Sequence, residues 1–118
     1  MDLALTGKGA IVTGGSKGIG KAVALELAKE GVDVAICARE RGALERTAAE
    51  LAEETGRRIV PVPADTMNRE SVEHFVETAL TELGRVDILV NNAAAPGGLV
   101  RGALAEADED ALLEDINT

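Results

Sequence analysis

The part of the sequence best suited to chemistry is the glycine-rich segment Thr-Gly-Gly-Ser-Lys-Gly-Ile-Gly at residues 13–20. An apolar run at residues 9–13 leads into it, and an amphipathic segment that starts at Ile19 follows it. A loop between a strand and a helix can bind an anion, because the first turn of a helix presents unpaired N–H groups and a partial positive charge. The segment therefore predicts a site for the diphosphate of a dinucleotide.

The three spaced glycines have separate expected roles. Gly14 allows a tight turn, Gly18 lets a diphosphate approach the backbone, and Gly20 lets the helix pack closely on the strand. The predicted ligand-binding residues of the loop are Gly14, Ser16, Lys17, Gly18, Ile19 and Gly20. The alternative is a glycine turn that holds no ligand.

A phosphate-binding loop of the nucleoside-triphosphatase type overlaps the same segment. Gly15, Gly20 and Lys21 have its spacing, but that motif next requires Ser or Thr to bind Mg²⁺, and the sequence has Ala22. The fourth predicted strand also ends in Asn91 rather than in an acid that could hold a metal. With one His and one Cys in the chain, no metal site is expected.

The rest of the sequence alternates between short apolar runs and longer amphipathic segments, which predicts an α/β fold with a parallel sheet and right-handed crossovers. Strands are expected at residues 9–13, 32–38, 59–62 and 86–90, and helices at residues 19–30, 40–55, from the Asn68 cap to the stop at Gly84, and from about Glu106 to the end. Residues 91–102 are expected to form a loop, and Pro61 places the third strand at a sheet edge.

Composition narrows the class of partners. The 118 residues suffice for one domain, and the net charge of -9 disfavours nucleic acid as a partner. The sequence has neither a signal peptide pattern nor a long apolar span, so we expect a cytoplasmic protein that does not enter a membrane. The single cysteine, Cys37, is expected in the core.

The pattern Thr13-Gly14-x-x-x-Gly18-x-Gly20 resembles the cofactor loop of short-chain dehydrogenases/reductases. In the extended, epimerase-like branch the second glycine comes one residue earlier, where this sequence has Lys17, so the sequence resembles the shorter reductase branch. The resemblance covers essentially the whole chain and about half of a family member. It implies a Rossmann-like sheet of order 3-2-1-4 with helices on both faces, and makes residues 1–118 a partial NAD(P)-binding domain.

The end of the second predicted strand favours NADP over NAD. An NAD-binding unit usually has Asp or Glu there to hold the ribose 2′-OH, whereas this strand is followed by Arg39. A guanidinium is suited to a 2′-phosphate, and Lys17 could reach the same group.

Further site residues are implied by the resemblance. Asp65 and Thr66 match the segment that binds adenine, although Asp65 can also be a turn residue before the Asn68 cap. Asn91 and Ala93 lie in Asn-Asn-Ala-Ala, which resembles the family's Asn-Asn-Ala-Gly; the asparagines would stabilise the sheet and the backbone after them would line the ribose. Asn117 matches the family's catalytic Asn, which holds a water for a proton relay from the helix after the fourth strand, with an ordinary helix-end Asn as the alternative.

The family reduces carbonyls or oxidises alcohols of small molecules by hydride transfer. Its Ser and Tyr-x-x-x-Lys would lie beyond Thr118, and the chain contains no Tyr. We therefore expect the cofactor-binding part of an NADP-dependent oxidoreductase that is inactive by itself; the alternative is an NAD(P)-binding or sensing module without chemistry. The fourth predicted strand would have a bare apolar edge, which predicts self-association into a homo-oligomer through that edge or through the last helix.

Overall fold

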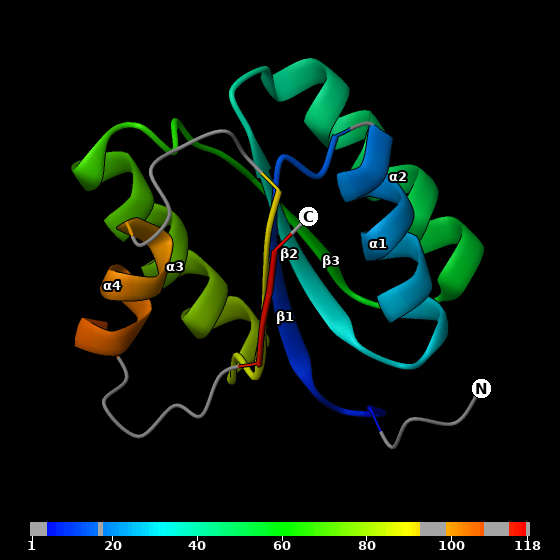
Figure 1. The fold of residues 1–118 in the computed structure, drawn as a ribbon. Helices are drawn as coiled ribbons and strands as arrows, with labels where there is room; N and C mark the ends of the chain where they lie inside the picture. Colours follow the sequence, from blue (N-terminus) through cyan, green and yellow to red (C-terminus); the bar gives the residue numbers. More distant parts are fainter. Residues whose placement is uncertain (1–4, 17, 93–98, 108–113, 118) are drawn as a thin grey trace.

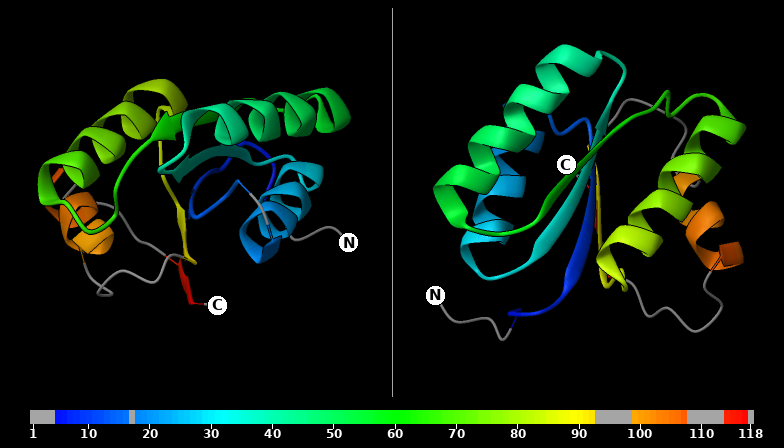
Figure 2. Two further views of the ribbon diagram at one scale, coloured as in Figure 1. Left: turned by 90° about the horizontal axis from the view of Figure 1, so that it is seen from above. Right: turned by 180° about the vertical axis from the view of Figure 1, so that it is seen from behind.

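The structure is a computed structural model that describes residues 5–16, 18–92, 99–107 and 114–117. They form a parallel sheet of five strands in the order β3-β2-β1-β4-β5, with helices on both faces (Figures 1 and 2). The elements are β1 (Gly9–Thr13), α1 (Gly18–Lys29), β2 (Asp33–Ala38), α2 (Arg41–Thr55), β3 (Ile59–Pro63), α3 (Arg69–Leu83), β4 (Ile88–Asn91), α4 (Leu99–Ala107) and β5 (Glu114–Asn117). The predicted Rossmann-like fold and the strand order 3-2-1-4 are confirmed.

Alternate residues of the central strands supply two separate cores. Helices α1 and α2 cover one face, where Val12, Ile36 and Val90 meet Ala24 and Leu44. Helices α3 and α4 cover the other face, which Figure 1 shows on the opposite side of the sheet. Because both faces are covered, the strands read as nearly continuous apolar runs rather than as alternating patterns.

The residues that begin and end the helices agree with most of the predicted boundaries. Asn68 caps α3 by accepting a hydrogen bond from the Ser71 amide at 3.0 Å. Gly56 and Gly84 end α2 and α3 in the left-handed conformation, with φ of 70° and 79°. Pro61 lies in β3 at the sheet edge, as predicted, where its missing N–H costs no ladder hydrogen bond.

The predictions for the end of the chain are wrong. Helix α4 begins at Leu99 within the predicted loop, because Val100 and Leu104 are 3% and 0% exposed and pack into the core of the α3 face. Residues 114–117 form β5 rather than a helix, and this strand pairs with β4 in parallel. The edge of β4 is therefore not bare, because β5 pairs with its backbone N–H and C=O groups.

Candidate nucleotide-binding site

The parallel sheet brings most of the predicted residues to one edge. Thr13 in β1 is in register with Cys37 in β2 and with Asn91 in β4, so these strands end together. The glycine loop, Arg39 and Asp65 each follow such a carboxyl end. In open α/β sheets this edge is where ligands bind, next to the point where the strand order reverses.

The first half of the glycine loop is held against β2. The Gly14 and Gly15 amides both donate to the Cys37 carbonyl oxygen, at 2.9 and 3.1 Å. A Cβ on Gly15 would lie 2.7 Å from the Ile36 Cβ, so no side chain fits there. These two amides are occupied, whereas the first turn of α1 presents further N–H groups to an anion.

That first turn has the geometry expected of an anion site. Gly18 has a φ of 63°, and a Cβ built on it meets no described atom within 4 Å, so the backbone there faces open space. The Gly18, Ile19 and Gly20 N–H groups open the helix, and no carbonyl oxygen of α1 is in place to accept their hydrogen bonds. The Ile19 side chain is 62% exposed. Lys17, the predicted cation of the loop, lies outside the described residues.

Gly20 sets how closely α1 approaches the end of β1. A Cβ at this position would lie 2.2 Å from the Gly14 carbonyl oxygen and 2.8 Å from Asn92 Nδ2. Only a glycine therefore allows the first turn of α1 to lie against the loop and the end of β4. This is the role that the spacing predicts for the third glycine.

Thr13, which the sequence analysis did not assign to the site, joins the ends of β1 and β4. It is fully buried, its hydroxyl accepts a hydrogen bond from the Asn92 amide at 2.9 Å, and Asn91 Oδ1 lies 3.1 Å away as an acceptor for the hydroxyl proton. The Asn91 side chain thus ties two central strands together, in agreement with the expected stabilisation of the sheet. The sequence feature that could have identified Thr13 is its position as a polar residue at the end of an apolar run.

Arg39 stands at the end of β2 beside a carboxylate. Its side chain is exposed, and among the described residues no acid pairs with it. Glu40 caps α2: Oε1 accepts from the Gly42 amide at 2.8 Å and Oε2 from the Ala43 amide at 2.6 Å. These amide hydrogen bonds lower the pKa of Glu40 from its usual value. The sequence placed Glu40 inside the helix, whereas its carboxylate occupies the helix N-terminus.

Asp65 serves the turn between β3 and α3. Its Oδ1 accepts from the Met67 amide at 2.9 Å, and its own amide donates to Ser71 Oγ at 2.8 Å. Asp65 therefore acts as a turn residue, which was the alternative interpretation of its position in the sequence. The turn uses one carboxylate oxygen, so an adenine contact through the other stays a prediction, as does the contact predicted for the Thr66 amide.

Two predicted residues lie near β4 and β5. Ala93 falls outside the described residues. The expected helical position of Asn117 is wrong, because it lies in β5, in register with Asn91. The backbone pairing keeps Asn117 at the carboxyl edge of the sheet, next to the strand that bounds the site.

The cysteine at the end of β2 is buried, as expected, and it is not a reactive group. Burial raises the pKa of the Cys37 thiol to about 12, so the thiol stays protonated at neutral pH. Its contribution to the site is the backbone carbonyl that holds the glycine loop.

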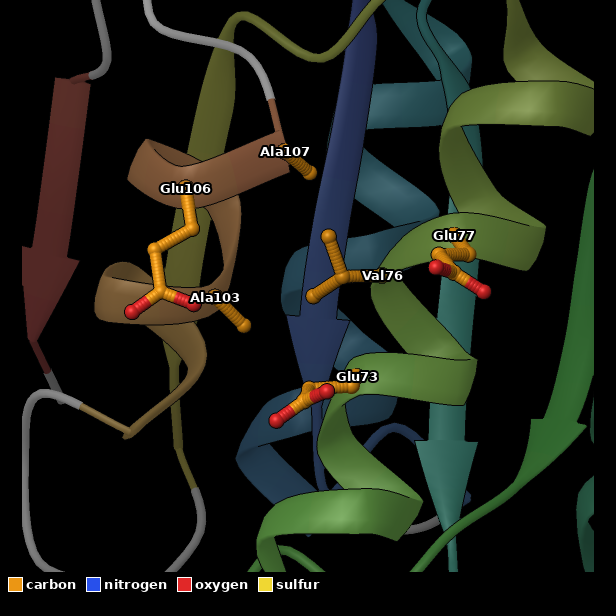
Figure 3. A pocket seen from close by; sticks show the side chains of 6 residues that line it. All are labelled: Glu73, Val76, Glu77, Ala103, Glu106 and Ala107. Atoms are coloured by element: carbon orange, nitrogen blue, oxygen red, sulfur yellow. The ribbon is translucent and has the colours of Figure 1, made fainter.

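A cavity between α3 and α4 is unsuited to a phosphate ligand. Figure 3 shows the carboxylates of Glu73, Glu77 and Glu106 around it, with Val76 between the helices. It lies on the face of the sheet that α1 and α2 do not cover, and three negative charges would repel a diphosphate. Within the described ranges no group of acids, His or Cys could hold a metal ion, and no helix is long and apolar enough to cross a membrane.

The fold and the glycine loop define a Rossmann-like α/β protein with a glycine-rich loop at the N-terminus of its first helix. The sequence profile of the short chain dehydrogenase family matches residues 8–118. The chain belongs to the short-chain dehydrogenase/reductase family.

Relatives in this family share both sequence and fold with the chain. It is 43% identical over 89 residues to short-chain dehydrogenase/reductase FrzI from Cladobotryum sp, covering 75% of this chain and 34% of the relative. The structure of L-sorbose reductase from Gluconobacter frateurii complexed with NADPH and L-sorbose is 34% identical, with a TM-score of 0.80 over 90% of this chain and 48% of that one. An NAD+-bound xylitol dehydrogenase is 25% identical, with a TM-score of 0.82 over 94% and 53%. The chain thus spans about a third to a half of these relatives' length.

Proposed function

We propose that the chain is the cofactor-binding part of an NADP(H)-dependent oxidoreductase that reduces a carbonyl or oxidises an alcohol of a small molecule. The observation that carries this proposal is the open first turn of α1 at the carboxyl edge of the sheet, with Arg39 at the end of the neighbouring strand. Relatives of the chain include an NADPH complex and an NAD+ complex, so the family accepts both cofactors.

The residues present fit the diphosphate of a dinucleotide. The backbone at Gly18 leaves space that a side chain would fill, and the amides of the α1 first turn have no internal acceptors. The diphosphate would be held there by N–H groups and by the positive end of the helix dipole. Ser16 and Ile19 would line the loop beside it.

Arg39 would select the phosphorylated cofactor. A guanidinium can form two hydrogen bonds with a phosphate, and no described acid neutralises it. Glu40 lies beside it, but its carboxylate is engaged by two backbone amides, which hold it toward α2. An acid that would accept a ribose 2′-OH does not occupy the end of β2, where Arg39 stands instead.

The other predicted contacts complete this proposal. Asp65 and Thr66 would bind adenine, Asn91 and Ala93 would border the ribose, and Asn117 would take part in proton transfer from the edge that β5 shares with β4. The bound nicotinamide would supply or accept the hydride. We also propose a cytoplasmic location and a homo-oligomeric state, which cell fractionation and sedimentation equilibrium would test.

Arg39→Asp tests the cofactor preference. The substitution should raise the Kd for NADPH by about 10- to 100-fold, as expected for the loss of one charged hydrogen-bonding group, and should change the Kd for NADH far less. Lys29→Asp, at the opposite end of α1, makes the same change in charge and should leave both affinities unaltered.

Fluorescence titration with each cofactor gives the two dissociation constants. Equal wild-type affinities for NADPH and NADH, or unchanged NADPH binding in Arg39→Asp, would contradict the NADP preference. Failure to bind either cofactor would contradict the nucleotide site itself, and binding without turnover in the full-length protein would favour a sensing module.

A further inference from the structure

A buried hydroxyl on α2 contacts the backbone of the glycine loop. Thr47 is 5% exposed, and its Oγ1 donates to the Ser16 carbonyl oxygen at 2.7 Å. These residues are 31 positions apart in the sequence. Among the described residues only Thr13 and Thr47 are buried and polar, and both bond next to or within the glycine loop.

The direction of this hydrogen bond is unusual for a helical threonine. Such a hydroxyl commonly bonds the carbonyl four residues earlier in its own helix. Thr55 in the same helix does so, since its Oγ1 lies 2.7 Å from the Leu51 carbonyl oxygen. Thr47 instead donates its hydrogen bond to the Ser16 carbonyl oxygen in the loop. Without that acceptor, the buried hydroxyl would destabilise the folded protein.

The loop is therefore held from two elements. The Cys37 carbonyl at the end of β2 accepts the Gly14 and Gly15 amides, and Thr47 on α2 binds the Ser16 carbonyl. The first attachment occupies the N–H groups of Gly14 and Gly15, and the second occupies the carbonyl oxygen of Ser16. A carbonyl oxygen turned toward a bound diphosphate would repel it, whereas one tied to α2 leaves the ligand side of the loop to N–H groups.

We propose that Thr47 is a positioning residue that fixes the glycine loop for the diphosphate. It belongs to the helix that begins just after Arg39, so it also fixes the distance between the diphosphate site and the 2′-phosphate site. This inference rests on the proposed nucleotide-binding function. It predicts a residue that touches no cofactor atom and yet controls the affinity for the dinucleotide.

Thr47→Val removes the hydroxyl and keeps the shape of the side chain. We expect the Kd for NADPH to rise about tenfold, the effect of losing one orienting hydrogen bond. The Kd for 2′-AMP, which has the 2′-phosphate and no diphosphate, should change by less than about twofold. Thr47→Ser should restore NADPH binding. Thr55→Val is the matched control, because it removes a hydroxyl of the same helix that bonds only within its own region.

Amide hydrogen exchange provides a readout that needs no ligand. In Thr47→Val, exchange at residues 14–16 should become faster than in Thr55→Val, and Thr47→Ala gives the same comparison if the valine variant does not fold. Wild-type NADPH affinity in Thr47→Val, an equal loss for 2′-AMP, or no rescue by serine would overturn the proposal. If the wild-type chain binds no NADPH, the proposed function fails, whereas unchanged loop exchange in a binding-competent chain refutes the positioning role alone.

Discussion

Gly20→Ala is the sharpest test of how the glycine loop is built. The added Cβ would lie 2.2 Å from the Gly14 carbonyl oxygen, and ordinary contact begins at 3.4 Å, so α1 or the loop must move by about 1 Å. The nearest neighbour is a backbone atom, so the shift cannot be absorbed by a flexible side chain. Overpacking of this kind costs about 1–3 kcal/mol.

Helix propensity acts in the other direction. Alanine is favoured over glycine in a helix by about 1 kcal/mol, which leaves a net destabilisation of about 0–2 kcal/mol. Gly102→Ala is the matched control, because this glycine lies inside α4 and a Cβ there meets no described atom within 4 Å. That variant should gain about 0.5–1 kcal/mol of stability.

Urea unfolding followed by circular dichroism would measure both free energies, and NADPH titration would measure binding. We expect Gly20→Ala to lose at least about tenfold in NADPH affinity, because a displacement of α1 moves the N–H groups of its first turn. Unaltered stability together with unaltered binding in Gly20→Ala would show that the close approach of α1 to the loop is unimportant.

Two further predictions concern the groups around the loop. Thr13→Val should destabilise the protein by about 1–3 kcal/mol, because it leaves the partly buried Asn92 amide and Asn91 Oδ1 without the hydroxyl that bonds them; Thr13→Ser should retain most of the stability, and equal unfolding free energies for the valine and wild-type proteins would refute this. Glu40→Gln should lower the melting temperature at pH 7. The folded-state pKa of Glu40 is lowered, so its contribution is present above its usual pKa of 4.5 and is lost as pH falls through the folded-state value. The melting temperatures of the two proteins should therefore converge in acid, and a pH-independent difference would contradict the assignment of the charge on Glu40 to the helix cap.

The local chemistry of the chain could be predicted because it depends on neighbouring residues. The Asn68 cap, the glycine stops at Gly56 and Gly84, and the apolar runs of β1 and β2 act within one turn or one strand. Alternating strands and helices then restrict the topology, since right-handed crossovers allow few arrangements. The place of the glycine loop follows from these patterns, whereas the sheet order was predicted from the resemblance of the loop to the family.

The secondary structure of the region after β4 could not be predicted in the same way. Glycine at position 102 and the glycines before it indicated a loop, but apolar contacts with α3 hold α4 as a helix from Leu99. The pairing of residues 114–117 with β4 is likewise a contact between distant segments. Propensity is a weak influence of about 1 kcal/mol or less per residue, and burial or strand pairing outweighs it.

By itself, the sequence determined the class of the protein and predicted the position of an anion site, because both depend on the spacing of glycines and apolar residues along the chain. Only the tertiary structure decided what holds that site in shape. The Cys37 carbonyl, the Thr13 hydroxyl and the Thr47 hydroxyl come from three different elements, and their partners lie 22 to 79 positions away along the chain. Such contacts have no local signature, since each becomes favourable only when packing has buried both of its partners.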